Sequence, residues 1–480
     1  MLEIYNTLTK KKEEFKPIKN KSVSFYQCGP TVYWVQHLGN MRAMVLADLI
    51  YRSLAYLGYE VKLARNYTDV GHLTSDADSG KDKMEITAKK EKLTPEAIAK
   101  KYIKIFKSDV KDLNCLKPKY QPRATVYIKP MAKMMQTLLD KGFAYATDLA
   151  IYFDISKAKD YTKLSGQDLS KNISEAGQGE VSDNGKKNPT DFAVWFFKAG
   201  VHQNALQTWN IKFKLPTGEV INQAGFPGWH LECSAMNQAL FGPTIDIHMG
   251  GIEHVPVHHT NEIAQSEAAS GVKFVNYWLH NEHLTVDGAK MSKSGGTAYS
   301  LTDLKAKGFE PLVLRYFFLQ AHYRSQQNFT FKALEGSRVA LNNLRNQILS
   351  LRAKIPTLRS GQAPQSHGKI NEEFKNKFIS AIADDFNISQ SLALVWGVLK
   401  SDLTDQEKLV TILDFDKVLG LGLSKIKAEK IPKEIKKLAE ERVIGRQNKD
   451  WQKSDKLRDK INNLGYLIED TSCGYIIKKK

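Results

Sequence analysis

The N-terminal part of the chain alternates short apolar runs with one long amphipathic stretch. Residues 23–28 (VSFYQC) form an apolar run typical of a buried strand, and a Gly-Pro pair ends it. Residues 41–58 carry apolar side chains at helical spacing, which predicts an amphipathic helix: Val45, Leu46, Leu49, Ile50 and Leu54. A second apolar run at 61–66 predicts another strand. Strand, helix and strand in this order predict the start of a parallel α/β sheet, where ligands bind beyond the carboxyl ends of the strands.

After the second predicted strand, the chain has a long stretch without alternating strands and helices. Residues 95–142 are mostly helical in pattern, and the Gly-, Asn- and Ser-rich segment 170–189 indicates an exposed loop within an insertion. Further along, the sequence predicts a strand at 246–249, a helix at 261–270, a strand at 283–286 and a polar loop at 287–300. From residue 311 the pattern is helical almost to the end.

A break in composition separates the last parts of the chain. Residues 359–369 (RSGQAPQSHGK) are rich in Gly, Pro, Ser and Gln, which makes this segment the best candidate for a linker. A helical block follows at 373–421, and a basic unit follows at 425–480. Because 480 residues are too many for one compact core, we expect two to four domains.

The charge balance adds the prospect of a polyanionic partner. Lys and Arg number 70 against 52 Asp and Glu, a formal net charge of +18. This excess favours binding to phosphate backbones, although a merely Lys-rich proteome explains it equally well. No apolar stretch is long enough to span a bilayer, and residues 1–21 lack the apolar core of a secretory signal. The cysteines are too widely spaced for a disulfide framework, so we expect a reducing cytoplasm: Cys28, Cys115, Cys233 and Cys473.

The polar loop holds the first candidate for phosphate chemistry. It reads Lys290, Met291, Ser292, Lys293 and Ser294 between flanking glycines. Two lysines three positions apart can close over a triphosphate and neutralise charge that develops at phosphorus, while hydroxyls and amides add hydrogen bonds. Segments rich in Lys and Ser are usually solvated loops. This particular order of five residues, in the second half of an α/β chain, favours a phosphate site instead.

A second candidate follows the first predicted strand, where His37, Leu38, Gly39 and Asn40 precede the helix. A helix N-terminus attracts phosphate through its free amides and its dipole. His37 can hydrogen-bond phosphate oxygens, and Gly39 would let an adenine ring approach the backbone. Alone, such a string is more often a turn with a surface histidine, but together with the lysine loop it indicates a nucleotide site.

These two strings resemble the HIGH and KMSKS motifs of class I aminoacyl-tRNA synthetases. Nearly the whole chain resembles the cysteinyl-tRNA synthetase family: YNTLTKKKEEFKP at the start, CGPTVY at 28–33, PGWHLECSAM at 227–236, HHTNEIAQSEA at 258–268 and HYRSQ at 322–326. The resemblance implies that a cytoplasmic monomer activates L-cysteine with ATP and Mg²⁺ and transfers it to tRNA(Cys). It implies ATP binding by His37, Gly39, Asn40, Lys290, Ser292 and Lys293, with His37, Asn40, Lys290 and Lys293 acting in catalysis.

The resemblance also implies a fold, namely a Rossmann-like doubly wound parallel sheet catalytic domain with an insertion, a helical bundle and a small anticodon-binding domain. We expect the catalytic halves at 1–115 and 226–285 with the insertion at 116–225, the KMSKS-bearing linking unit at 286–345, the bundle at 346–424 and the anticodon-binding domain at 425–480.

A zinc ion with structural and substrate-binding roles is also implied, and Cys28, Cys233, His258 and Glu262 match the family's four ligands. His258 and Glu262 are four residues apart at the start of a predicted helix, so both can face one ion. Zinc prefers thiolate to hydroxyl, which separates cysteine from serine better than a hydrophobic pocket can. Lone cysteines are more often small buried hydrophobes, and three more histidines could compete as ligands: His248, His254 and His259.

Around this metal, the resemblance places the substrate cysteine near Gly29, Thr31, Thr68, Trp229 and His248. Two of these residues have ordinary explanations as well, because Trp229 could belong to the core and Thr68 could cap a helix.

The C-terminal unit carries a candidate surface for unstacked anticodon bases. Arg446, Trp451, Asp455 and Arg458 read as lying on one helix, and the last three share a face. A tryptophan ring can stack on a base while Arg and Asp bond base edges, and Asp470 joins this set in the family pattern. The alternative is a basic amphipathic helix that packs Trp451 into a core.

Three features depart from the family pattern. Asn40 stands where the class mostly has histidine, residues 66–78 read NYTDVGHLTSDAD, and the connector 200–225 is longer. Asn40 can still donate a hydrogen bond, so we expect activation to be retained. Two other functions stay open: a cysteine ligase acting on an amino sugar, whose relatives lack a tRNA-reading domain, and a non-catalytic tRNA-binding paralogue with a decayed site.

Overall fold

The computed structural model describes residues 1–71, 83–168, 183–291, 296–355, 368–427, 432–471 and 474–479. The chain divides into two compact units, residues 1–424 and residues 425–480. No helix in the described ranges has both the length and the apolar character needed to cross a membrane.

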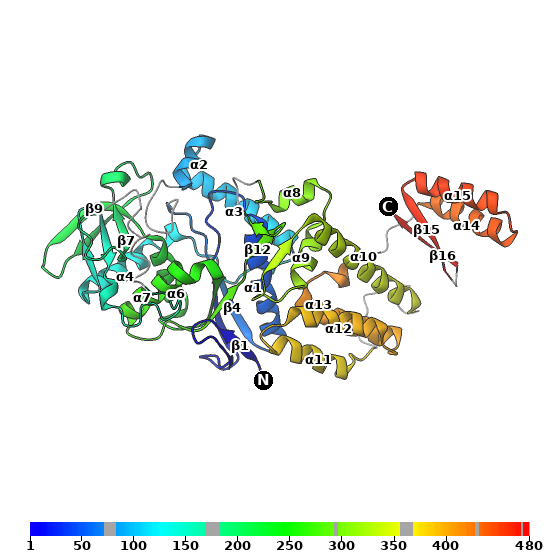
Figure 1. Ribbon diagram of the computed structural model, residues 1–480, viewed down its shortest axis with the longest axis horizontal. Helices are drawn as coiled ribbons and strands as arrows, with labels where there is room; N and C mark the ends of the chain where they lie inside the picture. Colours follow the sequence, from blue (N-terminus) through cyan, green and yellow to red (C-terminus); the bar gives the residue numbers. More distant parts are fainter. Residues whose placement is uncertain are drawn as a thin grey trace. The chain divides into compact units, whose positions relative to one another are not determined.

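A four-stranded parallel sheet lies at the centre of the first unit (Figure 1). Its strands are β3 (Ser22–Gln27), β4 (Glu60–Arg65), β10 (Ile245–Gly251) and β11 (Val275–Asn281), in the spatial order β11-β10-β3-β4. All three pairings are parallel. The chain runs outward from β3 to β4 and later returns to the other side of β3, so the strand order reverses between β3 and β10. Ligands of open α/β sheets bind at such a reversal.

The predicted strand-helix-strand opening is confirmed. Helix α1 (Leu38–Tyr56) joins β3 to β4, and a buried stripe that includes Met41, Val45 and Leu49 holds it against the sheet. Gly58, with a positive φ of 93°, turns the chain into β4. The predicted strand at 246–249 lies within β10, and the predicted helix at 261–270 corresponds to α7 (Thr260–Ser270). Helix α6 (Trp229–Phe241) precedes β10, and α7 precedes β11, a strand that the sequence did not predict.

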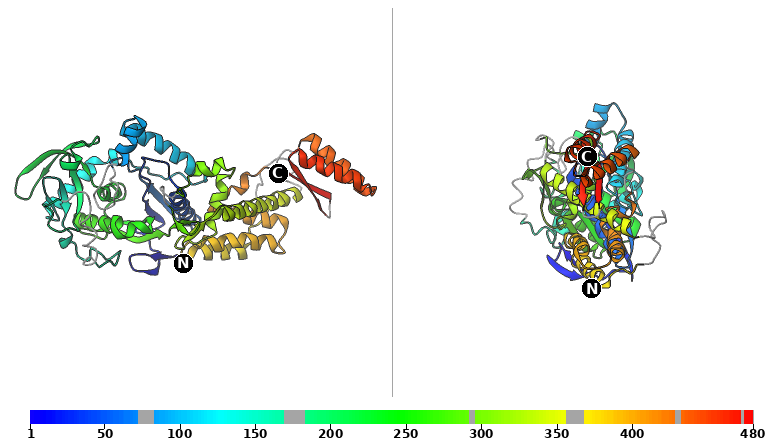
Figure 2. Two further views of the ribbon diagram at one scale, coloured as in Figure 1. Left: turned by 45° about the horizontal axis from the view of Figure 1, so that its top comes forward. Right: turned by 90° about the vertical axis from the view of Figure 1, so that its right-hand side faces the viewer.

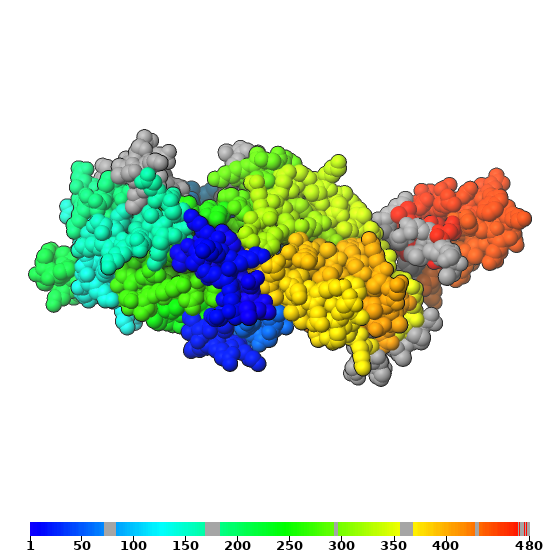
Figure 3. All heavy atoms as spheres, turned by 60° about the horizontal axis from the view of Figure 1, so that its bottom comes forward, coloured from blue at the N-terminus to red at the C-terminus, as the bar shows by residue number. Residues whose placement is uncertain are grey.

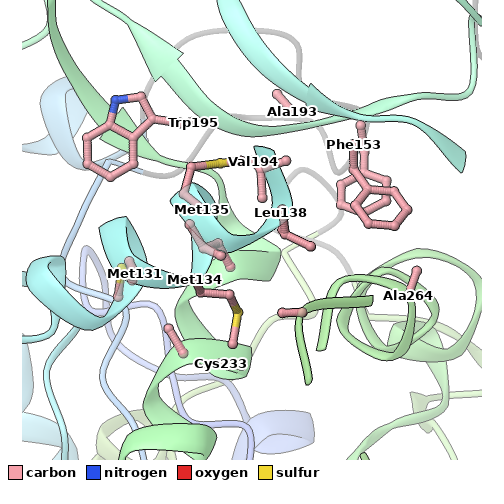
Figure 4. Close-up of a cluster of buried hydrophobic side chains, with 14 of the residues drawn as sticks. Met131, Met134, Met135, Leu138, Phe153, Ala193, Val194, Trp195, Cys233 and Ala264 are labelled. Carbon is pink, nitrogen blue, oxygen red and sulfur yellow. The ribbon is translucent and has the colours of Figure 1, made fainter. Parts of the chain in front are cut away.

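Helices α2 (Lys83–Glu91) and α3 (Pro95–Asp112) follow β4, and the region expected as the insertion contains helix α4 (Ile128–Asp140). It also contains an antiparallel sheet in the order β5-β6-β7-β9-β8, with the bounds Ala144–Ala146, Ala150–Phe153, Phe192–Phe197, Val220–Pro227 and Trp209–Lys214. The β8–β9 hairpin, which extends away from the parallel sheet, forms most of the long 200–225 connector (Figure 2). Methionines of α4 lie between Trp195 of β7 and Cys233 of α6, so one core joins the insertion to the catalytic part (Figure 4).

The start of the lysine loop belongs to a small three-stranded sheet. Its strands are β12 (Leu284–Val286), β13 (Ala289–Lys290) and β14 (Gln327–Phe329). Helices α8 (Leu301–Ala306) and α9 (Pro311–Leu319) follow the loop, and the helical bundle consists of α10 (Phe331–Lys354), α11 (Glu372–Ala383), α12 (Ile388–Lys400) and α13 (Asp405–Leu419). Most of the predicted linker at 359–369 and of the predicted loop at 170–189 lies outside the described residues. At the N-terminus, β1 (Glu3–Asn6) pairs with β2 (Lys11–Glu14).

The second unit corrects one prediction. Arg446 does not share a helix with Trp451, because the unit contains two helices, α14 (Lys433–Gln447) and α15 (Trp451–Asn463). Lys449 has a left-handed φ of 59°, which ends the first helix, and the carboxylate of Asp450 caps the second by accepting from the Lys453 amide. The strands β15 (Tyr466–Thr471) and β16 (Gly474–Lys479) complete the unit.

Candidate active site

A cluster of metal-ligating side chains lies at the strand reversal between β3 and β10. Cys28 directly follows β3, and its amide donates to the carbonyl of Met249 in β10. His258 and His259 end a five-residue π-helix (Val255–His259), and Glu262 lies in the first turn of α7. The ligand atoms of Cys28, His258, His259 and Glu262 all lie within 4.8 Å of one another, and all four side chains are buried.

Short contacts connect this cluster. The thiol of Cys28 lies 3.3 Å from His259 Nε2 and 3.4 Å from His248 Nε2. Glu262 Oε1 lies 3.0 Å from His258 Nε2 and 3.9 Å from Cys28 Sγ. Cys233 of α6 lies close to Cys28, and its thiol helps to raise the pKa of the Cys28 thiol. Two further potential ligands, His248 and Cys233, therefore adjoin the buried group of four.

Further hydrogen bonds orient the histidine rings of the cluster. Nδ1 of His259 lies 2.7 Å from Nε2 of His280, which leaves His259 Nε2 toward Cys28. Nδ1 of His258 lies 3.0 Å from His230, which leaves its Nε2 toward Glu262. Partners of this kind fix ring orientation at metal sites.

The burial of several ionisable groups in this cluster favours a bound cation. Burial raises the pKa of the Cys28 thiol and of the Glu262 carboxyl well above their ordinary values, and in both cases Cys233 adds to the shift. Burial also lowers the pKa of His259 well below its ordinary value. Glu262 Oε2 has no hydrogen-bond partner among the described residues, which is costly for a buried carboxylate oxygen. A divalent cation would stabilise the thiolate and the carboxylate together, so the donor set fits a metal ion.

The structure brings together three of the four sequence-predicted metal ligands in this compact group, namely Cys28, His258 and Glu262. The fourth position of the group is held by His259, while the predicted Cys233 lies next to Cys28. The sequence named His259 only as a competitor.

Of the five residues predicted around the substrate cysteine, Trp229 and His248 contact this cluster, and Gly29 directly follows Cys28. Thr31 and Thr68 form a parallel bridge beyond the ends of β3 and β4. Trp229 stacks on His258 with ring centroids 4.1 Å apart, and His248 contacts Cys28. Gly29 donates its amide to the side chain of Asn66, a partner that the sequence did not suggest.

The two nucleotide motifs are also close together. His37 is the N-cap of α1, and a methyl group on Gly39 would lie 3.5 Å from Cε of Met291. The Leu38 amide donates to the carbonyl of Tyr299, behind the lysine loop. Lys290 ends the exposed strand β13, whereas Ser292 and Lys293 lie outside the described residues.

Asn40 caps the first turn of α1 together with His37. Its side-chain oxygen accepts from the His37 amide, and its own amide donates to His37 Nδ1, which makes a capping box with distances of 3.3 Å. No acidic side chain lies in the first turn of α1, so the positive end of the helix dipole there favours an anion.

Replacing Asn40 with alanine removes one half of this capping box. We expect Asn40→Ala to destabilise the protein by about 1 kcal/mol, measured as a lower midpoint of thermal unfolding. Asn343→Ala is the matched control, because Asn343 is exposed within α10 and gains helix propensity on substitution. Equal midpoints for Asn40→Ala and the wild type would contradict the capping role.

The predicted anticodon residues gather in the second unit. The Arg446 guanidinium lies over the Trp451 ring at 5.5 Å, and the ring is 56% exposed, which excludes a core position. Asp470 lies 3.3 Å from Arg446, and Arg458 lies 3.4 Å from Asp455. The sequence did not suggest Arg442, whose two-pronged hydrogen bond holds Asp470 and keeps the pKa of that carboxyl below its ordinary value.

Comparison with known proteins agrees with this architecture. The family described as the class I (C) tRNA synthetase catalytic domain matches residues 14–339. A leucyl-tRNA synthetase of Agrobacterium radiobacter K84, solved as a ternary complex with tRNA, has a TM-score of 0.58 at 12% identity, covering 86% of both chains. A methionyl-tRNA synthetase of Mycobacterium tuberculosis has a TM-score of 0.53 at 15% identity, covering 83% of this chain and 90% of its own. The family match, with a fold that agrees with it, defines the chain as a class I aminoacyl-tRNA synthetase.

Full-length relatives define the family more narrowly. Cysteine–tRNA ligase 1 of Burkholderia lata is 39% identical over 476 residues, covering 98% of this chain and 96% of its own. Cysteine–tRNA ligase of Treponema denticola is 38% identical over 493 residues, covering 98% of each chain. The chain belongs to the cysteine–tRNA ligase family.

Proposed function

We propose that this chain joins L-cysteine to tRNA(Cys) in two steps, with cysteinyl-adenylate as the intermediate. The observation that carries the proposal is the buried donor cluster beside Cys28, at the strand reversal of a fold whose two nucleotide motifs meet at Gly39 and Met291. The full-length similarity to cysteine–tRNA ligases supports the same reaction.

Cys28, His258 and Glu262, with Cys233 or His259 as a further ligand, would hold a zinc ion. When bound, zinc supplies a soft Lewis-acid site that accepts the substrate thiol far more readily than the hydroxyl of serine. Around it, Gly29, Thr31 and Thr68 would bind the substrate along the strand ends, while His248 and the stacked Trp229 would close the pocket and exclude water.

The activation step would rest on positioning and charge. The cysteine carboxylate attacks the α-phosphate of ATP bound with Mg²⁺, and pyrophosphate leaves. His37, Gly39 and Asn40 at the start of α1 would bind the nucleotide from one side, and Lys290, Ser292 and Lys293 from the other. The charge that develops on the phosphates would be stabilised by His37, Asn40, Lys290 and Lys293, without a covalent enzyme intermediate.

The second unit would bind the anticodon of tRNA(Cys) through Arg446, Trp451, Asp455, Arg458 and Asp470. The exposed ring of Trp451 offers a stacking surface for a base, and the net charge of +18 of the whole chain favours binding to the polyanionic tRNA. We also propose that the protein is a monomer in the cytoplasm. Its catalytic domain would have a Rossmann-like doubly wound sheet, and the chain would divide into the six parts expected from the sequence.

One pair of assays tests this function against the alternatives. We expect ATP–pyrophosphate exchange that depends on cysteine and is nearly absent with serine, followed by cysteinylation of tRNA(Cys). Exchange without tRNA charging would favour an amino-sugar ligase, and binding of tRNA without exchange would favour a non-catalytic paralogue.

Truncating the exposed tryptophan should separate the two steps. Because stacking of a base on an aromatic ring contributes about 1–3 kcal/mol, we expect Trp451→Ala to lower kcat/KM for tRNA by about 5- to 150-fold. Pyrophosphate exchange without tRNA should stay at the wild-type rate. Ile444→Ala removes another exposed apolar side chain of this unit, 53% exposed, and serves as the control. An equal loss in both variants would argue against a specific contact at Trp451.

A further inference from the structure

The turn between α11 and α12 has an unusual backbone. Asp385 and Phe386 are consecutive non-glycine residues with φ of 52° and 54°, and both are buried. Left-handed backbone is rare for a bulky residue such as phenylalanine. It persists where the surroundings determine it, and such positions cluster at functional sites.

The surroundings of Asp385 come from two distant parts of the chain. Its carboxylate accepts from the Tyr5 amide at 2.9 Å, from the Tyr323 hydroxyl at 2.6 Å and from Arg324 Nε at 2.7 Å. Its backbone amide donates to Glu3, and its carbonyl lies 2.9 Å from His322 Nε2. The turn thus holds both β1 and the segment 322–325, which we term the clasp loop. Figure 3 shows the N-terminal segment against the helical bundle.

A buried arginine holds the clasp loop from its other side. Arg42 lies on α1, two residues after Asn40, and its side chain is fully buried. One nitrogen donates to the carbonyls of His322 at 3.3 Å and Ser325 at 2.7 Å. The other donates to the carbonyls of Glu282 and His283, directly before β12.

Each of these segments continues into a nucleotide motif. Arg42 belongs to the helix that begins with the His37–Asn40 string. Residues 282 and 283 lead into β12, and Thr285 of β12 pairs with Lys290 of β13. The clasp loop also contacts the segment directly before β12, since the Glu282 amide donates to the carbonyl of Tyr323 at 2.9 Å.

We propose that Asp385 and Arg42 are positioning residues of the activation step. They hold the clasp loop between them, and the loop sets the helix that begins at His37 against the strand pair that carries Lys290. The inference rests on the proposed nucleotide roles of those two motifs. Both residues lie outside the donor cluster at Cys28, so their loss should displace the phosphate-binding groups while the cysteine site keeps its composition.

The kinetic signature of this role differs from that of a packing residue. A displacement of about 1 Å of reacting groups lowers a rate by about a hundredfold. For Asp385→Asn, which keeps the side-chain shape but weakens the bond to Arg324, we expect kcat of cysteine-dependent pyrophosphate exchange to fall 10- to 100-fold. KM for cysteine should stay within twofold of the wild type, and so should the zinc content. Arg42→Lys keeps the positive charge but removes the second donor nitrogen of the guanidinium. We therefore expect the same result, a lower kcat with an unchanged KM for cysteine.

The neighbouring residue offers a matched control. Asp384 receives the same substitution to asparagine, but it lies at the surface, where its carboxylate pairs with Lys12. Exposed ion pairs contribute little, so Asp384→Asn should keep wild-type kcat. If Asp385→Asn does not fold, Tyr323→Phe removes a single bond to the same carboxylate and should lower kcat 3- to 10-fold with unchanged KM for cysteine.

A double-mutant cycle decides whether the two residues act together. Because both act through the clasp loop, the combined loss in kcat for Asp385→Asn with Arg42→Lys should be well below the product of the single losses. Multiplicative losses, or losses that match the unfolded fraction measured by circular dichroism, would overturn the inference. An absence of exchange in the wild type would instead overturn the proposed function, so the two failures are distinguishable.

Discussion

Cys28→Ser is expected to abolish cysteine-dependent pyrophosphate exchange and to reduce the zinc bound per chain. The thiol lies within 4 Å of both His248 and His259 and of Glu262, and a hydroxyl is a much poorer ligand for zinc than a thiolate. Loss of a ligand's hydrogen-bond partner alone costs about 10- to 100-fold. We therefore expect Cys28→Ser to lower kcat/KM for cysteine by more than about a hundredfold, with zinc measured by elemental analysis.

The same substitution at a partly buried cysteine serves as the control. Cys115 lies near Arg315 and the carbonyl of Met44, away from the donor cluster, and burial raises the pKa of its thiol to about 12. Cys115→Ser should therefore retain zinc and exchange activity. If Cys28→Ser kept full zinc content and cysteine-dependent exchange, the cluster would not be the substrate site.

The sequence predicted three strands of the parallel sheet but missed β11 and the insertion sheet. Parallel strands are buried on both faces, and the apolar residues of β3, β4 and β10 marked them as strands, although polar residues interrupt each run. Strand β8 reads WNIKFK, and most of its side chains are partly or fully exposed, so its pattern has no continuous apolar run. Its pairing with β9 depends on a contact that no single segment encodes.

The ligand set shows the limit of helical spacing as an argument. Spacing on an α-helix places residue 262 on one face with residue 258, four positions before it, and with residue 259, three positions before it, so spacing alone cannot choose between the two histidines. The π-helix Val255–His259 has a wider turn, and with it both His258 and His259 reach the cluster. The many histidines between residues 248 and 283 were the only signal in the sequence for this arrangement.

The C-terminal unit shows a similar limit. Trp451, Asp455 and Arg458 share α15 as predicted, but Arg446 reaches the tryptophan ring from the preceding helix. The contact between Arg446 and Trp451 arises from a turn of three residues, 448–450, whose left-handed Lys449 has no distinct sequence signature.

Gly29→Ala is expected to have an effect of comparable size on activation by a different route. A methyl group on Gly29 would lie 1.8 Å from the backbone oxygen of Asn66 and 2.8 Å from its carbonyl carbon, far inside van der Waals contact. Neither neighbour is a flexible side chain, so the ends of β3 and β4 must separate. Overpacking of this kind costs about 1–3 kcal/mol or more in stability.

The displacement would fall where the substrate should bind, because Gly29 follows Cys28 and precedes the bridge between Thr31 and Thr68. We expect kcat/KM for cysteine in pyrophosphate exchange to fall by about a hundredfold or more, as for a misplacement of about 1 Å. Gly336→Ala is the control: Gly336 lies within α10 with no atom within 4 Å of an added methyl group, so this variant should gain about 0.5–1 kcal/mol. A folded Gly29→Ala variant with wild-type kcat/KM would show that the strand ends do not form the cysteine site, whatever the metal content of the cluster.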